Sequence, residues 1–299
     1  MEHITIGNHQ YNFVSDFKHV EKIRQSFNNL TRRTYAFDFE EWYRSGYWQD
    51  GYIPYSLLDD EKVICNVSVN VIDFLVMGEK KKLVQIGTVM TDEAYRHRGL
   101  NRFIMERVLE EWQSKCDSIY LFANNTVLNF YPKFGFVKMD EYQHSTQVEE
   151  PNSNKIFEKL NMSNDKHIAF LCDKIKVSVP ASRLAMRNNV GLVMFYCTSY
   201  MSEQIYYIKA LDTIVIAETD HDILYLHDVF SDHEVSINDI ISAMVEPQVN
   251  RVVFGFTPQE TSSYDVNLLQ TDDTTLFVLD GKNEFIEKKH VMFPVLSHA

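Results

Sequence analysis

Cysteine, long apolar runs and positive charge are all scarce in this sequence of 299 residues. The four cysteines, Cys65, Cys116, Cys172 and Cys197, lie far apart, and no pair has the spacing of a zinc site or a disulfide scaffold. We therefore expect buried free thiols. No stretch approaches the ~20 apolar residues that cross a bilayer, and the first residues carry no basic segment followed by an apolar run. A cytoplasmic location is the default expectation.

Basic residues are outnumbered, because 29 Lys and Arg face 42 Asp and Glu, which leaves a formal net charge of −13. Such a charge repels nucleic acid and anionic membranes over long range, so neither is an expected partner. Hydrophobic residues make up 45% of the chain and charged residues 24%. This composition is typical of a soluble globular protein with one large domain or two ordinary ones.

The most informative stretch runs from Val84 to Lys138. Val84–Thr91 is short and rich in β-branched residues, which predicts a buried strand. A helix with one apolar face is predicted next, because four apolar residues follow at fourfold spacing: Leu100, Ile104, Val108 and Trp112. Backbone N–H groups at such a junction converge and bind anions. The loop between them holds Gly99 and carries added positive charge, so a pyrophosphate would fit it.

The motif Arg96-x-x-Gly99-x-Asn101 resembles the Gln/Arg-x-x-Gly-x-Gly/Ala loop of the GNAT superfamily of acyl-CoA-dependent N-acyltransferases. The order downstream is similar too, since Ser118–Ala123 predicts the next strand, and a helix start is expected at Asn124. A tyrosine and a Gly-Phe ending follow within Phe130–Phe136. The resemblance implies an α/β fold with a mixed twisted sheet flanked by helices, and acetyl-CoA or coenzyme A as the cofactor.

The resemblance also implies roles for single residues. The backbone of Val89, Met90 and Thr91 would pair with the pantetheine arm, and the pyrophosphate would lie on the loop and helix start formed by Arg96, His97, Arg98, Gly99, Leu100, Asn101 and Arg102. Tyr131 stands where the family has its general acid, with a packed aromatic residue as the alternative. Asn124 would bind the coenzyme or cap a helix. Since Asn101 replaces a small residue, its side chain must turn from the phosphates or bond to them.

Aromatic residues are concentrated between positions 35 and 55: Tyr35, Phe37, Phe39, Trp42, Tyr43, Tyr47, Trp48, Tyr52 and Tyr55. In the GNAT fold this region usually forms one wall of the acceptor site. Packing of the first helices on the sheet explains most of the rings. We expect Glu41, Trp42 and Trp48 to bind the substrate amine through charge and cation–π contacts, with Trp48 and Glu41 facing it most directly.

The general base is not evident, because Val84–Thr91 contains no carboxylate or histidine. Three candidates remain open: Glu41, a water relay through Asn66 or Asn70, and the terminal carboxylate of Ala299 next to His298. The last is included because some multi-domain members of the superfamily use the end of the chain in this way.

Two domains are predicted, a GNAT acetyltransferase domain over residues 1–145 and a degenerate GNAT-like domain over residues 164–299, with a linker over 146–163. The second half repeats the strand, strand, helix, strand order of the first: Leu211–Ala217, Ile223–Val229, a helix that Ser236 caps, and Arg251–Phe256. The position of the phosphate loop holds carboxylates and no glycine there: Asp228, Asp232 and Glu234. We therefore expect one coenzyme site per chain, in the first half.

Several further expectations follow from local patterns. Residues 1–60 are predicted to be mainly helical, with Asp16 as the cap of a first helix that reaches Leu30, and Ile156–Leu160 is predicted to be a short helix. The apolar end of the chain should be tied into a sheet. His221, His227 and His233 lie near acidic residues, but a hairpin with solvated charges explains them, and we expect no metal.

Three functions are compatible with these patterns. The first is an N-acetyltransferase that moves an acetyl group from acetyl-CoA to a primary amine of a small molecule or peptide by direct attack. The second is a non-catalytic acyl-CoA-binding sensor, and the third is a structural protein with a relic of the fold. The intact loop around Gly99 argues against the third. The sequence leaves the acceptor open, as it does the choice between a monomer and a homodimer.

Overall fold

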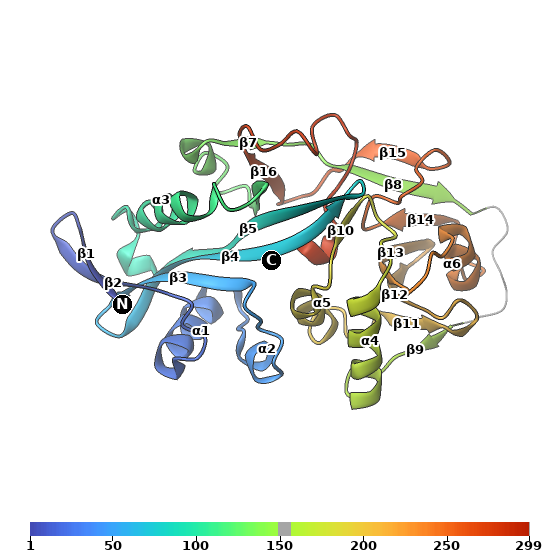
Figure 1. Cartoon of the computed structure of the whole chain (residues 1–299), viewed down its shortest axis with the longest axis horizontal. Coiled ribbons are helices and arrows are strands. Elements are labelled where there is room, and N and C mark those ends of the chain that lie inside the picture. Colours follow the sequence, from blue (N-terminus) through green and yellow to red (C-terminus); the bar gives the residue numbers. More distant parts are fainter. Residues whose placement is uncertain (149–156, 299) are drawn as a thin grey trace.

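The structure is a computed structural model that describes residues 1–148 and 157–298. Two mixed sheets stand side by side, with helices on their faces (Figure 1). The strands of the first sheet are β1 (Glu2–Ile6), β2 (His9–Ser15), β3 (Tyr52–Asp59), β4 (Lys62–Val76), β5 (Glu79–Thr91), β6 (Ser118–Ala123), β16 (Thr275–Leu279) and β7 (Phe136–Lys138), with β10 (Leu184–Met186) paired to β4. This architecture confirms the predicted mixed α/β fold class.

The second sheet is built mainly from the second half of the chain. Its strands, in spatial order, are β15 (Asp265–Leu268), β8 (Tyr142–Gln147), β14 (Arg251–Phe254), β13 (Ile223–Phe230), β12 (Thr213–Asp220), β11 (Ile205–Ile208) and β9 (Glu158–Lys159). The α-helices of the described residues are α1 (Glu21–Tyr35), α2 (Glu40–Arg44), α3 (Leu100–Trp112), α4 (Asp165–Val177), α5 (Val190–Cys197) and α6 (Ile237–Met244), and the 3₁₀ turns are η1 (Glu93–Tyr95), η2 (Tyr131–Phe134), η3 (Lys209–Leu211) and η4 (Val295–Ser297). None of these helices is long and apolar enough to span a membrane.

The first fifteen residues correct the expectation of a helical start. β1 and β2 form an antiparallel hairpin whose turn contains Gly7 at φ 63°. The Gly-Asn pair between two alternating runs was the available signal for it. α1 begins only at Glu21, with Val20 as its N-cap residue and no side-chain cap, so Asp16 does not cap it. The Asp16 N–H donates instead to the carbonyl of Pro54 at 3.1 Å.

Two shorter predictions were also wrong. Asn124 does not start an α-helix, since the chain passes through turns into η2. The segment predicted to be a helix at 156–160 contains strand β9 in its described part, while residue 156 lies outside the described residues.

The four cysteines are free thiols, as predicted. Cys116 is half-buried, and the other three are buried.

The halves exchange strands: β8, from the first half, joins the second sheet, while β10 and β16, from the second half, join the first sheet. Parallel crossovers β5–α3–β6 and β13–α6–β14 define corresponding strands in the two sheets. The strand next to β6 is β16, from near the end of the chain, while the strand next to β14 is β8, from the first half. The predicted division at 146–163 stays a prediction, and the strands β8, β10 and β16 pair across it.

The end of the chain packs between the two sheets. The ring of Phe293 stacks on that of Tyr120, with centroids 4.1 Å apart, and Leu296 is fully buried in the cluster that α4 and α5 share with β11–β13. The Val295 N–H donates to the carbonyl of Gly255 at 2.9 Å. The tail is thus anchored as expected, but mainly by packing, and it forms a 3₁₀ turn instead of a strand.

Candidate active site

β5 and β6 run side by side for only part of their length. Their parallel pairing joins Leu83–Ile86 to Ser118–Leu121 and ends there. From Gly87 onward, the edge of β5 that faces β6 has no strand partner among the described residues. An opened strand edge offers backbone groups to an extended ligand that carries amides.

A bulge at Thr88 shapes this opening. The register between β4 and β5 shifts at this point, and Thr88 has φ 49°, in the left-handed region. Asn66 Nδ2 donates to the Thr88 carbonyl at 2.9 Å, and the Tyr52 hydroxyl lies 2.7 Å from Thr88 Oγ1. A non-glycine residue in this conformation costs of order 1–3 kcal/mol, so the surrounding bonds must hold it. The polar face of β4 is therefore buried and serves to fix the bulge.

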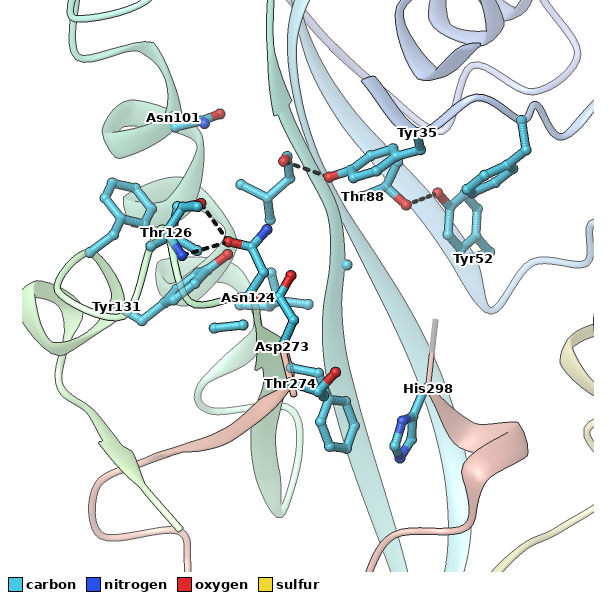
Figure 2. A pocket seen from close by; sticks show the side chains of 18 of the residues that line it. Tyr35, Tyr52, Thr88, Asn101, Asn124, Thr126, Tyr131, Asp273, Thr274 and His298 are labelled. Carbon is cyan, nitrogen blue, oxygen red and sulfur yellow. Dashed lines mark hydrogen bonds between the residues drawn. The ribbon is translucent and has the colours of Figure 1, made fainter. Parts of the chain in front are cut away.

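The opening leads into a cavity of about 710 Å³. In the view of Figure 2, Asn101, Asn124 and Tyr131 lie on one side of the strands that cross it, and Tyr35 and Tyr52 lie on the other. Its first wall comes from β5, β6 and the turns after β6. Rings from both halves of the chain form the opposite wall, which we call the aromatic end: Tyr35, Phe37, Phe39, Trp42, Tyr52, Phe195, Tyr196 and Tyr200.

The second half of the chain reaches this site through α5. Phe195 lies 5.7 Å from Phe39 and 5.7 Å from Trp42 between ring centroids, and Tyr200 lies 6.2 Å from Phe37. Trp42 Nε1 donates to the carbonyl of Gly191 at 2.7 Å. A Cβ at Gly191 would stand 2.7 Å from the Tyr47 carbonyl oxygen, so only glycine permits this approach of α5 to the segment after α2.

Tyr131 lies in the cavity wall at the start of η2, with 5% of its surface exposed. Its ring packs against Phe130 and Phe277, with centroids 5.2 and 6.0 Å away. Burial raises the pKa of its phenol, with a smaller contribution from Tyr35, so the group is protonated at neutral pH. No hydrogen bond joins its hydroxyl to another described residue, which leaves the proton available to a ligand.

Asn124 also lines the cavity, where β6 ends. Its Oδ1 accepts bonds from the Thr126 N–H at 3.0 Å and the Thr126 hydroxyl at 2.5 Å (Figure 2). Asp273, from the segment before β16, accepts a bond from the Asn125 N–H at 2.7 Å. Asn124 therefore caps a turn while its Nδ2 stays free of these two bonds, which leaves both predicted roles compatible with its position.

The loop before α3 has the features that an anion site requires. Gly99 is the N-cap of α3 with φ 77°, no side chain caps the helix, and a Cβ placed on Gly99 would meet no atom within 4 Å. The first amides of a helix have no partner within it. Arg98 stacks over the Tyr95 ring at 4.8 Å, and His97, like the other basic side chains of the loop, is exposed. These residues fit the pyrophosphate of coenzyme A.

Asn101, the departure from the family motif, turns toward the sheet. Its Oδ1 accepts a bond from the thiol of Cys65 at 2.7 Å, and burial raises the pKa of that thiol to about 12, so the thiol keeps its proton. The amide therefore bonds a neighbour on β4 while its residue also lines the cavity. Leu100 is buried in the core beneath α3, and Arg102 points outward and pairs with Glu106 at 2.8 Å.

Of the three residues predicted to hold the pantetheine arm, only Val89 lines the cavity. Its carbonyl accepts a bond from the Tyr35 hydroxyl at 2.8 Å. Met90 is buried under α1, and Thr91 lies 3.4 Å from the Cys65 sulfur. The cavity is lined instead by Gly87 and Thr88, which precede Val89 and which sequence reasoning missed.

Of the three residues predicted to bind the acceptor amine, only Trp42 lines the cavity. Trp42 lines the aromatic end, whereas Trp48 packs in the core and its Nε1 donates to the Tyr52 carbonyl at 3.0 Å. Glu41 has 87% of its side chain exposed and does not line the cavity. Ala299 lies outside the described residues.

His298 lies at the base of the cavity, with its ring stacked on Phe122 at 3.7 Å. Burial lowers its pKa to about 4, so the imidazole is neutral at pH 7. Its Nε2 is buried and has no hydrogen-bond partner among the described residues. Its backbone carbonyl accepts a bond from the Tyr196 hydroxyl, which links the end of the chain to α5.

The histidines of the second half do not converge on one point. His221 pairs with Asp220, His233 pairs with Asp232, and His227 is half-buried on β13. Among the described residues, no group of three or more His, Cys, Asp or Glu side chains could hold a metal ion.

Comparisons with known proteins agree with this geometry. Residues 18–139 match the family model of the GNAT acetyltransferase domain. This part of the chain belongs to the GNAT superfamily. The match covers β3 to β7 together with α1, the Gly99 loop and Tyr131, and so contains most of the first sheet and one wall of the cavity.

Solved structures extend the likeness to the whole fold. A probable N-acyltransferase from Enterococcus faecalis has a TM-score of 0.54 at 13% identity, covering 90% of this chain and 72% of that one. A GCN5-related N-acetyltransferase from Kribbella flavida gives 0.52 at 14%, covering 90% and 72%, and Eis1 from Mycobacterium abscessus gives 0.51 at 10%, covering 90% and 73%. No curated protein sequence matches the chain. At such low identity the likeness shows a shared fold, second sheet included.

Proposed function

We propose that the protein is an N-acetyltransferase that transfers an acetyl group from acetyl-CoA to a primary amine by direct attack. The observation that carries this proposal is one continuous cavity. It begins beside the N-terminus of α3, passes the opened edge of β5 and Tyr131, and ends among aromatic rings. A thioester held along the first wall and an amine held among the rings would lie in one cavity at the same time, which direct transfer requires.

The residues of the first wall would hold the coenzyme. Amides at the start of α3 would bind the pyrophosphate with help from the helix dipole, and the free edge of β5 at Gly87–Val89 would bind the pantetheine amides. When bound, the thioester supplies the acetyl group. One coenzyme site per chain remains our proposal, because carboxylates occupy the corresponding junction of the second half.

Tyr131 would act as the general acid. The amine nitrogen forms a bond to the acetyl carbon, the carbon–sulfur bond breaks, and the Tyr131 hydroxyl gives its proton to the departing sulfur. The proton that the amine loses returns to the phenolate through water. The terminal carboxylate of Ala299 stays the candidate base, because Glu41 is exposed and Asn66 is buried beneath the bulge.

The test is an assay of free thiol release from acetyl-CoA with a panel of amines, run beside a binding titration with coenzyme A. We expect saturable binding and amine-dependent release. Binding without release for any amine would favour the acyl-CoA sensor instead, and no binding at all would contradict both functions.

A further inference from the structure

A second, smaller cavity lies where the two halves of the chain meet. It holds about 160 Å³ beside the start of α5, and residues of the β10–α5 segment line it together with residues of β4 and of the turn after α2 (Figure 1). We call it the polar cavity, after the polar side chains in its lining: Gln49, Asn70, Asp73, Arg187, Asn188 and Asn189. Trp42, Tyr52 and Leu192 line both cavities, so the two spaces adjoin.

Arg187 lies at the polar cavity with its guanidinium unpaired. The residue is exposed, and no hydrogen bond, ion pair or ring contact engages its side chain among the described residues. Every other arginine in the described part of the chain has such a partner, as Arg24 has in Glu40 at 3.1 Å. In a protein with 42 acidic residues and 29 basic ones, this arginine is available to an anion from outside the chain.

The first turn of α5 adds donors to the same cavity. The Asn189 side chain caps the helix and accepts the Leu192 N–H at 3.2 Å. The N–H groups of Val190 and Gly191 have no partner within the helix, and Gly191 lines the cavity. The helix dipole favours negative charge at this end.

A buried amide on β4 is an independent sign of a ligand. Asn70 lines the cavity with 5% of its surface exposed, and its Nδ2 has no hydrogen-bond partner among the described residues. A buried donor that stays unpaired destabilises the fold, so native proteins rarely keep one. An oxygen atom of a bound ligand would give this donor a partner.

Asp73 is the one carboxylate in the described lining, and its charge is offset. Its side chain is 67% exposed, and one carboxylate oxygen lies 3.4 Å from Lys82 Nζ. The Arg187 N–H donates to the Asp73 carbonyl at 2.8 Å, which holds the two backbones together without pairing the guanidinium. The unpaired charge at the polar cavity is therefore positive.

We propose that the polar cavity binds a small carboxylate. The two oxygens of a carboxylate match the planar fork of the Arg187 guanidinium, and the α5 amides and Asn70 Nδ2 would supply further donors. Trp42 Nε1 donates to the Gly191 carbonyl at 2.7 Å, so the carboxylate would hold α5 against the aromatic end of the larger cavity. The binding does not depend on the proposed function, whereas its effect on an acceptor does.

Propionate is the probe for binding. At about 50 mM it should raise the Tm of the wild type by about 2 °C relative to chloride at the same ionic strength. Arg187→Gln should abolish this shift. Arg107→Gln, which removes the same charge from a residue of α3 that pairs with Glu2 and does not line the cavity, should keep it. No shift in the wild type, or an equal shift in Arg187→Gln, would overturn the proposal.

Turnover distinguishes two sources of the carboxylate, the acceptor itself and a separate small molecule. 6-Aminohexanoate and hexylamine differ by one carboxylate. If the acceptor supplies it, kcat/KM should be about tenfold higher for 6-aminohexanoate, and Arg187→Gln should remove the difference. If a separate molecule supplies it, propionate should lower KM for hexylamine about threefold in the wild type and leave it unchanged in Arg187→Gln.

Binding and turnover fail separately. If propionate binds through Arg187 but no amine releases thiol from acetyl-CoA, the proposed function is wrong and the carboxylate site stands. If thiol is released but responds neither to propionate nor to the carboxylate of 6-aminohexanoate, the link from the polar cavity to the aromatic end is wrong.

Discussion

In each sheet, a parallel strand pair separates beside a bulge. β5 separates from β6 near the bulge at Thr88, and β13 separates from β14 near the bulge at His227. Beyond the bulge the two regions differ. In the second sheet the pairing continues past the bulge, because the Gly255 N–H donates to the Leu226 carbonyl at 2.8 Å. Val295 packs against Gly255 so closely that a Cβ on Gly255 would stand 3.0 Å from Val295 Cγ2. The chain itself closes this gap, while the first sheet keeps a cavity.

The two junctions also differ in charge. Arginines surround Gly99 before α3, whereas the segment before α6 holds Asp232 and Glu234 and no glycine. Lys174 is engaged there by Asp212 at 2.8 Å and Asp232 at 3.5 Å. The comparison teaches that topology alone does not make a coenzyme site: an open strand edge, a free helix start and positive charge must coincide.

The largest effect should come from closing the first junction. Gly99→Val places a β-branched residue at φ 77° in the space proposed for the pyrophosphate, so affinity for coenzyme A should fall about 100-fold in a calorimetric titration. Gly281→Val is the control, since it introduces the same strain at φ 73° on an exposed turn. The wild type should bind one coenzyme per chain. Binding of two coenzymes per chain would contradict the conclusion that only the junction before α3 forms a coenzyme site.

Tyr131→Phe should lower kcat by about 100-fold or more, because the departing sulfur loses its acid, with coenzyme affinity unchanged. Tyr264→Phe, a phenol of the second half, should leave kcat as it is. Since burial raises the pKa of Tyr131, the acid form survives to higher pH than an ordinary tyrosine, so kcat should fall only above pH ~10. A fall between pH 8 and 9 would argue against this phenol as the acid.

Asn66→Ala tests the bulge that opens the first sheet. The substitution removes the donor to the Thr88 carbonyl and should lower the free energy of unfolding by about 1–3 kcal/mol in urea titrations. If the bulge positions the acetyl group, kcat should also fall while the affinity for coenzyme A, measured separately, stays close to that of the wild type. Loss of stability with unchanged kcat would make the network purely structural.

Glu141 tests the tail that closes the second sheet. Its carboxyl accepts the Phe293 N–H at 2.8 Å, and burial raises its pKa to about 7. A pKa above the unfolded value means that this group's contribution to stability is complete in its protonated form, below pH ~4.5, and is lost as pH rises through about 7. Glu141→Gln should reduce the fall in Tm between pH 5 and 7, and an identical pH profile for both proteins would contradict the assignment.

Much of the first wall could be predicted from sequence because its signals are local. The spacing of Leu100, Ile104 and Val108 gave α3, and Gly99 before it gave the loop. Trp48 and Glu41 could not be ranked correctly, because the direction of a side chain on the five-residue helix α2, or in the loop that follows it, depends on what packs against it. Phe195 and Tyr200 carry no local signal for a role at a cavity that residues of the first half largely form.

The sequence by itself determined the strand–loop–helix unit around Gly99 and the repeat of that unit in the second half, because periodicity, glycine and charge act over a few neighbouring residues. Only the tertiary structure decided which of the two gaps between separating parallel strands, β5–β6 or β13–β14, stayed open as a cavity. The exchange of β8 and β16 and the path of the tail past Gly255 depend on packing between distant segments. That packing brings α5 to the cavity in the first sheet and fills the corresponding gap in the second.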